Sequence, residues 1–239
     1  MRFTIKWLGQ GGYQFQLGDK ELVVDPYLSD SVNEFDGLAR LVPVPIQPEA
    51  LMPDLIVCTH DHIDHLDQAT LKHTDFLKNT YAGPENCLAQ FRKMGIPEKN
   101  LRSLNRGESL TLGEATIHGV FAEHTADSIG LVIQYQGTTL YVVADSTYEA
   151  QLLEASQYNP DVLICCINGK WGNMNYTDAA KLAKKLGVKV AIPGHYGMFA
   201  QNTEDPAKFT AALAGSPIEA YELQFNQEYS VNDILAKAK

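Results

Sequence analysis

The sequence has no long hydrophobic run and no excess of positive charge. Its 239 residues are 45% hydrophobic and 20% charged, and no apolar stretch reaches the ~20 residues that a membrane-spanning helix needs. The formal net charge is −10. Nucleic-acid binding usually requires a basic surface that displaces counterions. We therefore expect a globular protein that acts on a small molecule, with neither a nucleic acid nor a membrane as its partner.

Cysteine is scarce too, with four residues in the chain. Cys58, Cys165 and Cys166 lie in apolar, strand-like runs, where a free buried thiol is the usual state. Residues 1–8 alternate like a β-strand and lack the apolar core of a signal peptide. Both features argue against a secreted, disulfide-based scaffold and predict a reducing, cytoplasmic location.

The hydrophobic pattern predicts strands and helices that alternate along the chain. Apolar runs and glycine-containing turns predict strands over 3–8, 13–17, 21–24, 55–58, 109–112, 116–122, 129–134, 139–143, 161–167 and 188–192. Helices are predicted over 67–79, over 85–94, and between a Thr177 cap and Gly187. The last helix completes a β-α-β unit in the final third of the chain.

Residues 27–54 are rich in proline and show little periodicity. Long irregular loops in compact domains are often binding loops, so we expect this one at the rim of a site. No linker or low-complexity segment divides the chain. We therefore expect a single domain over residues 1–239, of the α/β (α+β) class, with two mixed β-sheets packed face to face and helices outside.

Residues 59–65 are the most informative stretch of the chain. They read Thr-His-Asp-His-Ile-Asp-His and follow the apolar run 55–58 directly. Imidazoles and carboxylates at this density compete for water and repel one another when protonated, whereas a divalent cation binds neutral imidazole and carboxylate together. A polar turn that is merely rich in histidine is the alternative. We expect a metal site here.

Further candidate ligands lie at three other predicted strand ends: His124, Asp145 and His195. Ligands in α/β proteins gather beyond the carboxyl ends of strands, so folding is expected to bring these side chains to one cleft. Each also has a structural alternative as a loop residue or, for Asp145, as a helix cap. His118 competes with His124, but six strand residues span about 20 Å, and only His124 lies at the strand end. His73 falls in a predicted surface helix and is assigned no function.

These segments resemble the motifs of the metallo-β-lactamase superfamily. Residues 59–65 resemble its HxHxDH motif, 124–130 its third motif, 144–147 its bridging-aspartate motif, and 193–196 its last histidine motif. The matches occur in the family's order and extend over nearly the whole chain. The resemblance implies a four-layer αββα sandwich, which agrees with the two packed sheets expected from the strand pattern.

The resemblance also implies two groups of metal ligands joined by a shared aspartate: His60, His62 and His124; Asp64, His65 and His195; and Asp145 between them. It places Asp25 behind the ligands, where it would orient a ligand histidine. Ala144 stands where many relatives have glycine, which is harmless unless the backbone there needs a positive φ. A donor set without cysteine suits one or two zinc or manganese ions, or iron.

Such a metal centre lowers the pKa of a bound water toward neutrality and polarises the oxygen of the substrate. Asp64 and Asp145 are therefore the candidate catalytic residues, and Asp64 is expected to act as a general base when a single ion is bound.

Within the superfamily, the likeness is greatest to the ascorbate-6-phosphate lactonase group and related small metal-dependent hydrolases. It rests on residues 7–12, 168–169, 172–175 and 195–199. The loop 168–175 offers four polar side chains to a sugar-like substrate: Asn168, Lys170, Asn173 and Asn175. Lys170 would neutralise a phosphate, and Tyr196 is a further candidate contact. The alternative is that these side chains satisfy the backbone of their own loop.

The sequence thus predicts a metal-dependent hydrolase that uses a metal-activated water to open a lactone or ester. The expected substrate is small and polar or phosphorylated, like a sugar acid. A phosphodiesterase of the same fold and a non-catalytic metal-binding or sensor protein are the alternatives, because ligands alone do not establish catalysis. Related small hydrolases often self-associate, so a homo-oligomer is expected.

Overall fold

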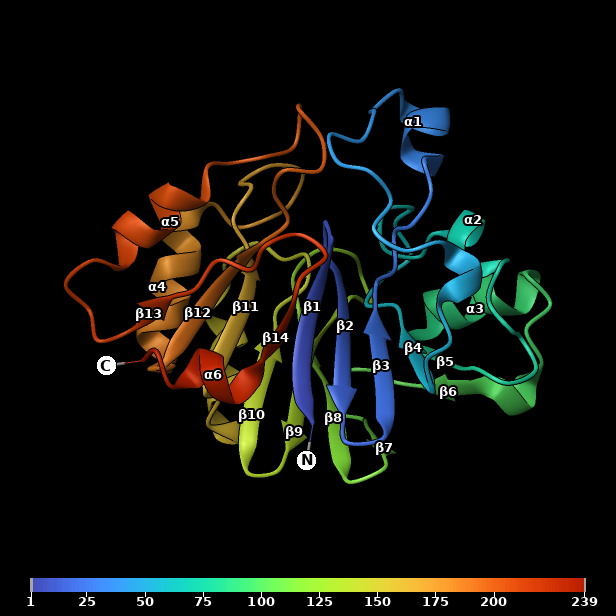
Figure 1. The fold of residues 1–239 in the computed structure, drawn as a ribbon, viewed down its shortest axis with the longest axis horizontal. Coiled ribbons are helices and arrows are strands. Elements are labelled where there is room, and N and C mark those ends of the chain that lie inside the picture. Colours follow the sequence, from blue (N-terminus) through green and yellow to red (C-terminus); the bar gives the residue numbers. More distant parts are fainter. Residues whose placement is uncertain (1, 239) are drawn as a thin grey trace.

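The computed structural model describes residues 2–238 and contains two β-sheets of seven strands each (Figure 1). The first sheet has the strand order β14-β1-β2-β3-β4-β5-β6. Its strands are β1 (Phe3–Gly9), β2 (Gly12–Leu17), β3 (Lys20–Val24), β4 (Leu55–Val57), β5 (Thr80–Gly83), β6 (Leu101–Ser103) and β14 (Glu228–Ser230). β14, β1, β2 and β3 pair antiparallel, and β3 to β6 pair parallel, so the sheet is mixed.

The second sheet repeats this arrangement with the strand order β13-β12-β11-β10-β9-β8-β7. Its strands are β7 (Ser109–Leu112), β8 (Ala115–Phe121), β9 (Ile129–Tyr135), β10 (Thr138–Val142), β11 (Val162–Cys166), β12 (Val190–Gly194) and β13 (Glu219–Ala220). β7 to β10 pair antiparallel, and β10 to β13 pair parallel. The parallel strands β11 and β12 are buried throughout, as their continuous apolar runs predict.

The two sheets face each other across an apolar core. Ile5 and Phe15 of the first sheet belong to the same buried cluster as Ile117 and Leu131 of the second. All four side chains are fully buried. In β1, inward residues alternate with half-buried ones, because successive side chains of a strand point to opposite faces. This alternation sets which face of each sheet meets the other.

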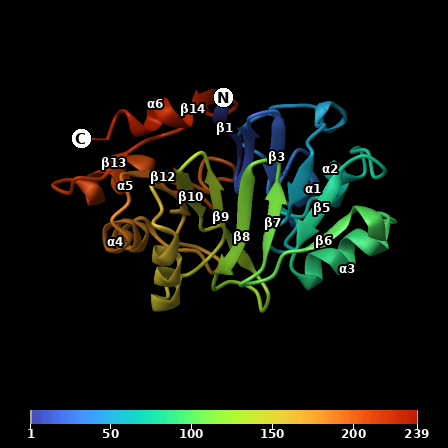
Figure 2. The same ribbon diagram turned by 90° about the horizontal axis from the view of Figure 1, so that it is seen from below.

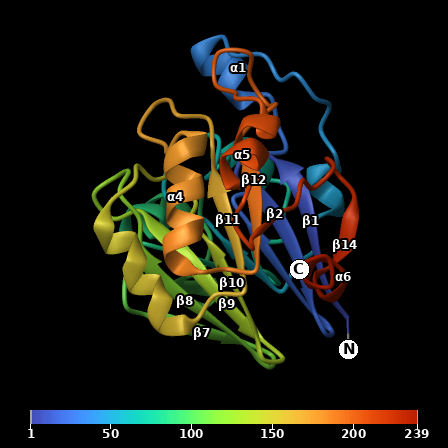
Figure 3. The same cartoon turned by 90° about the vertical axis from the view of Figure 1, so that its left-hand side faces the viewer.

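Helices cover the outer face of each sheet. The longer ones are α3 (Glu85–Lys93), α4 (Tyr176–Leu186) and α5 (Pro206–Leu213), with a 3₁₀ segment η3 (Ala150–Tyr158). Seen from below, α3 lies on one side of the molecule and α4 and α5 on the other (Figure 2). Leu88 and Phe91 of α3 pack in one apolar cluster, and Leu182 of α4 and Phe209 of α5 pack in another, on the side seen in Figure 3. The predicted four-layer αββα fold is confirmed.

The short helical elements are α1 (Ser31–Asp36), η1 (Pro48–Ala50), α2 (Gln68–Leu71), η2 (Glu98–Asn100) and α6 (Val231–Leu235). Within residues 2–238, no helix has the length and apolar character needed to cross a membrane. The segment 27–54 is largely irregular, as predicted, although the sequence did not indicate α1. It stands above the edge where the parallel strands end (Figure 1).

The predicted helix over residues 67–79 is wrong beyond α2. The hydroxyl of Thr74 donates a hydrogen bond of 2.6 Å to the carbonyl of Leu71, just after the end of the helix. The carboxylate of Asp75 accepts from the N–H groups two and three residues later. Such side-chain to main-chain bonds offer the backbone an alternative to the helix, which explains why it ends early.

The predicted cap of α4 is also wrong by two residues. Asn175, not Thr177, is the N-cap, because its side-chain oxygen accepts from the N–H groups of Thr177 and Asp178 at 2.9 Å. The C-terminal end of α4 is as predicted, with Gly187 in the left-handed conformation.

Candidate metal centre

Strand ends from both sheets deliver the predicted ligands and their neighbours to one edge of the molecule. These side chains follow β1, β3, β4, β8, β10 and β12, in that order: Gln10, Asp25, residues 59–65, His124, Asp145 and His195. Three groups of donors have their ligand atoms within 4.8 Å of one another: His60, His62 and His124; Asp25, His60 and His65; and Asp64, His65 and His195. The convergence expected from the strand ends is therefore found.

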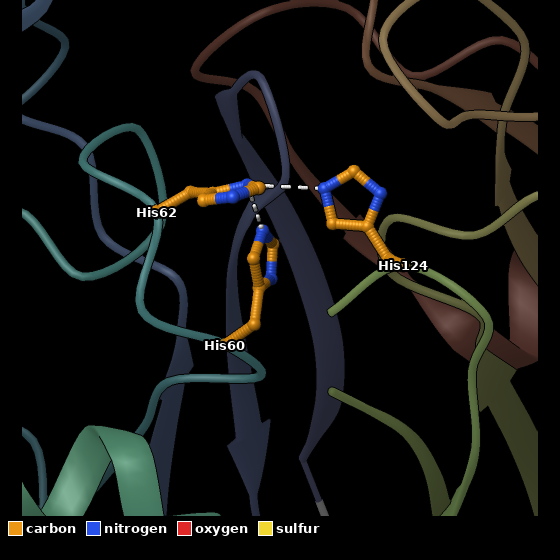
Figure 4. A group of neighbouring side chains, drawn as sticks. All are labelled: His60, His62 and His124. Carbon is orange, nitrogen blue, oxygen red and sulfur yellow. Dashed lines mark hydrogen bonds between the residues drawn. The ribbon is translucent and has the colours of Figure 1, made fainter. Parts of the chain in front are cut away.

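The first group is a trio of imidazoles (Figure 4). His62 Nδ1 lies 3.1 Å from His60 Nε2 and 3.0 Å from His124 Nε2. One ring nitrogen carries either one proton or one lone pair, so His62 Nδ1 cannot satisfy both neighbours. Zinc holds imidazole nitrogens at about 2.0–2.1 Å, which places two such nitrogens about 3.3 Å apart in a tetrahedral site. The spacing of the trio fits a shared cation.

We call Asp64, His65 and His195 the second group. The carboxylate of Asp145 joins it to the imidazole trio. Asp145 lies between the groups, with Oδ1 3.2 Å from His195 Nε2 and Oδ2 3.4 Å from His65 Nε2 and 3.7 Å from His124 Nε2. Asp64 Oδ2 is 3.7 Å from both His65 Nε2 and His195 Nε2. His65 Nε2 and Asp145 Oδ1 are buried and have no hydrogen-bond partner among the described residues. Inward-facing orphan atoms of this kind fit a bound ion.

The outer nitrogens of three histidines are held by the protein. His65 Nδ1 lies 2.8 Å from the Asp25 carboxylate, and His60 Nδ1 lies 3.1 Å from Thr59 Oγ1. His124 Nδ1 lies 3.1 Å from the carbonyl oxygen of Gly172. A hydrogen bond at the outer nitrogen fixes the tautomer and leaves the inner lone pair for a metal, which is the usual arrangement of ligand histidines.

The two groups differ in protonation. Burial lowers the pKa of His60 well below its usual value and also lowers the pKa of His124, so both rings are neutral. Burial opposes protonation of His195 as well, but the carboxylates of Asp145 and Asp64 outweigh it and raise the pKa of His195 to about 9. The same balance raises the pKa of His65. The second group therefore attracts positive charge, which a divalent cation would supply.

Asp64 and Asp145 are ionised. Burial alone would raise their pKa values, but His65 and His195 hold the pKa of Asp64 and the pKa of Asp145 well below the usual range. Ionised carboxylates and neutral imidazoles are the forms that bind a metal, so a cation at the second group would displace the protons of His65 and His195. The donor set fits divalent ions, whose binding releases these protons.

The predicted role of Asp25 is consistent with its contacts. Besides His65, its carboxylate accepts hydrogen bonds of 2.7 Å from the N–H and from the hydroxyl of Thr59. Asp25 is fully buried and thus links the end of β3 to the start of the histidine segment. These bonds orient both Thr59 and the His65 ring.

Gln10 is a site residue to which the sequence analysis gave no role. Its side chain is fully buried, and Nε2 lies 2.7 Å from Asp64 Oδ2 and 3.1 Å from His195 Nε2. The available signal was its place at the end of an apolar strand, in the segment 7–12. Gln10 holds the Asp64 carboxylate in place from the first sheet.

Backbone strain is concentrated around this centre. Five residues other than glycine have a left-handed backbone at the site: Gln10, Asp25, Ala144, Trp171 and His195. Left-handed backbone costs an L-residue about 1–2 kcal/mol and persists where the surrounding structure over-determines it. The condition set for Ala144 is met, because its φ is +60°. Alanine at this position is therefore strained, as the stated exception anticipates.

Two other histidines lie outside the site. His118 Nε2 lies 3.0 Å from Gln134 Oε1, and its ring packs against Tyr158. His73 pairs with Glu49 at 2.7 Å on the surface. The structure therefore brings His124, and not His118, to the imidazole trio.

A cavity of about 240 Å³ opens on the centre. Five predicted ligands line it: His62, Asp64, His124, Asp145 and His195. Asn173, Asn202 and Trp171 line it as well. A larger cavity of about 560 Å³ lies between α1, α2 and α3, but among its described lining residues none is a predicted ligand. The chemistry therefore belongs to the smaller cavity.

Of the predicted substrate-binding residues, some line this cavity and others do not. Asn173 lines it and donates from Nδ2 to Asp145 Oδ2 at 3.0 Å. Asn168 lies behind it, donating to Asn202 Oδ1 at 2.6 Å. Lys170 is exposed and donates to the carbonyl of Gln201 at 2.7 Å, and it is not among the described residues that line the cavity.

Asn175 and Tyr196 also lie away from the cavity. The Asn175 side chain caps α4, so the alternative that loop side chains satisfy their own backbone holds there. The Tyr196 ring packs against Trp7 at a centroid distance of 4.9 Å and borders a separate cavity. Neither faces the residues of the centre.

We predict that His62→Ala lowers the metal content of the protein by about one ion per chain, because the imidazole trio loses its central nitrogen. His62 is exposed, so the fold should survive the change. Metal analysis of the purified variant is the measurement, and His73→Ala is the control. Equal metal content in the His62 variant and the wild type would contradict this role.

Asp25→Asn should weaken zinc binding by about 10–100-fold, the usual cost of losing an outer partner of a ligand histidine. The amide keeps the shape but replaces one accepting oxygen with a donor. Competition with a chromophoric chelator measures the affinity. Asp19→Asn, at a side chain that is 88% exposed, is the matched control. The role fails if both variants bind zinc like the wild type.

Ala144→Gly should raise the free energy of unfolding by about 1 kcal/mol, because glycine adopts the left-handed backbone without strain. Urea denaturation followed by circular dichroism measures the change. Ala115 lies at a buried strand position without a positive φ. As the control, Ala115→Gly should lower the free energy of unfolding. A less stable Ala144 variant would show that no strain is relieved.

Comparison with known proteins identifies the family. The model of the beta-lactamase superfamily domain matches residues 20–196. The chain is 30% identical to a metal-dependent hydrolase of Pyrobaculum islandicum over 227 residues, which cover 91% of this chain and 95% of the relative. It is 26% identical to a metal-dependent hydrolase of Archaeoglobus fulgidus over 246 residues, covering 95% and 99%.

The fold of this chain also matches that of a solved metallo hydrolase. The solved structure of Igni18, a metallo hydrolase from Ignicoccus hospitalis, superposes with a TM-score of 0.79 at 17% identity, and the match covers 96% of this chain and 98% of that one. The resemblance seen in the histidine and aspartate motifs is thereby confirmed. The chain belongs to the metallo-β-lactamase superfamily and is one of its metal-dependent hydrolases.

Proposed function

We propose that this hydrolase opens a lactone, or a related ester, of a small substrate. The observation that carries the proposal is the small cavity of about 240 Å³, into which the ligands and Asn173 converge. A cavity of this size admits a small molecule and no folded polymer. The net charge of −10 further disfavours a nucleic-acid substrate.

In this proposal, each residue group has a defined role. His60, His62 and His124 hold one ion, Asp64, His65 and His195 hold a second, and Asp145 lies between them. Zinc and manganese are the first choices for this donor set, with iron the third. When bound, the metal centre supplies a water of lowered pKa and polarises the carbonyl of the substrate.

The reaction balances with water as the sole co-reactant. The water oxygen bonds to the carbonyl carbon, and the carbon–oxygen bond of the ring breaks. Asp64 is ionised and held by Gln10, so its carboxylate can accept the proton of the water and return it to the leaving oxygen when a single ion occupies the imidazole trio. The product carries one hydroxyl and one carboxylate, and the second proton of the water is released to the solvent.

Asn173 positions the reacting groups. Its Nδ2 must be the atom that faces Asp145, because an ionised carboxylate only accepts hydrogen bonds. The remaining oxygen, Asn173 Oδ1, is buried and without a partner in residues 2–238. The bond from Nδ2 orients the Asp145 carboxylate from the loop 168–175.

The cellular setting forms part of the proposal. All four cysteines are free and buried, as is usual in a reducing compartment. This supports a cytoplasmic hydrolase with a small-molecule substrate and no nucleic-acid partner. Self-association stays a prediction.

An activity panel tests the proposal. Zinc- or manganese-loaded protein should hydrolyse lactones faster than phosphodiesters or thioesters. Asp64→Asn should lower kcat by about 100-fold or more, because the variant loses both a ligand and a base, whereas Asp19→Asn should match the wild type. Cleavage of phosphodiesters alone would replace the assignment with a phosphodiesterase. Full metal loading without turnover of any substrate would indicate a binding or sensor protein.

A further inference from the structure

We infer that the substrate is uncharged and carries an apolar group, and that the cavity excludes phosphorylated compounds. The inference deepens the proposed function and rests on it for the reaction. The separate observation behind the inference is the apolar part of the cavity lining. The binding of non-reacting compounds tests it separately from turnover.

Part of the cavity lining is apolar. Val32, Leu38, Ile63 and Phe199 line the cavity together with the metal ligands. Val32 and Phe199 are 4% and 1% exposed, and Leu38 and Ile63 pack against the same apolar cluster. A packed wall cannot rearrange freely to expose polar groups, so it favours an apolar partner.

The cavity offers no cation beyond its imidazoles and the metal centre. Among the described residues that line it, none is lysine or arginine. Lys170 is engaged with Gln201, and the Arg40 guanidinium donates to the main-chain carbonyls of Tyr27, Ser29 and Val42. A phosphate placed against the wall would therefore lose water without gaining a partner, which is strongly unfavourable.

An acidic side chain among the lining residues disfavours an anion. Asp36 lines the cavity and is exposed. The net charge of −10 adds a long-range field that slows the approach of anions.

The space directly at the metal centre is small. Cavities that take drug-sized ligands measure about 300–1,000 Å³, and this one is about 240 Å³. A small ring with a short alkyl group fits this space better than a sugar phosphate. The inferred substrate class is thus a small, uncharged, alkyl-substituted lactone or ester.

The test uses two γ-lactams, which keep the ring shape but resist hydrolysis. One carries a butyl side chain, and the other carries the same chain ending in a phosphate. Isothermal titration calorimetry with the zinc-loaded protein gives both affinities. We expect the butyl lactam to bind at least about tenfold more tightly, because the lactam ring takes the metal centre and the described lining offers the phosphate no lysine or arginine. Equal or tighter binding of the phosphorylated lactam, or no binding of either, overturns the inference.

A pair of variants locates the effect. Leu38→Lys places an ammonium on the half-buried wall and should improve binding of the phosphorylated lactam by about fivefold, the scale of a partly exposed ion pair. Leu41→Lys adds the same charge at a position that is 56% exposed and outside the cavity lining, so it should change neither affinity. Circular dichroism checks the fold. Identical effects of the two variants would overturn the assignment of the wall.

The two proposals can fail independently. If the butyl lactam is preferred but the loaded protein hydrolyses no lactone, the proposed reaction is wrong and the inferred cavity preference stands. If lactones are hydrolysed but the phosphorylated lactam binds equally well, the reaction stands and the inferred substrate class is wrong.

Discussion

Buried charge at one edge of two packed sheets is the constraint on which the rest of this structure depends. Asp145 is nearly fully buried and contacts imidazoles from both donor groups. Burying an uncompensated charge is costly, so each ionisable group must have partners. Asp25, Gln10 and the Gly172 carbonyl provide them from three separate segments. The loops above the sheets are consequently held in fixed positions.

The left-handed residues follow from the same constraint. Asp25 and His195 come directly after β3 and β12, where the chain must turn sharply to aim a side chain at the centre. The strain is tolerated because the sheets beneath are tightly packed and the hydrogen bonds of the centre determine the backbone. In this protein, part of the stability of the sandwich is used to hold the geometry of the site.

The cavity is lined by loops as well as by the metal ligands. The ligands follow strand ends, whereas Val32, Leu38 and Phe199 come from α1, the loop after it and the segment after β12. A shared fold with exchangeable loops supports many hydrolytic reactions, so the family alone does not determine the substrate. The apolar wall and the small volume carry the specific information about this chain.

Most of the fold and the donor set could be predicted from the sequence, because both depend on local chemistry. Apolar runs gave the main strands of both sheets, and the residue types in 59–65 indicated a metal site before any contact was known. The short strands β5, β6, β13 and β14 were not predicted, since two to four residues carry too little periodicity. The early end of α2 depended on hydroxyl and carboxylate bonds that periodicity does not reveal.

Tertiary structure alone decided which polar side chains face the cavity. Lys170 and Asn173 belong to one loop and looked equivalent, yet one contacts Gln201 and the other contacts Asp145. Gln10 gained its role only when the end of β1 and the segment after β4 met at one edge of the first sheet. The sequence determined which chemical groups the chain could offer, because residue type and spacing are local properties. The direction of each side chain depended on partners distant in sequence, and only folding brings these together.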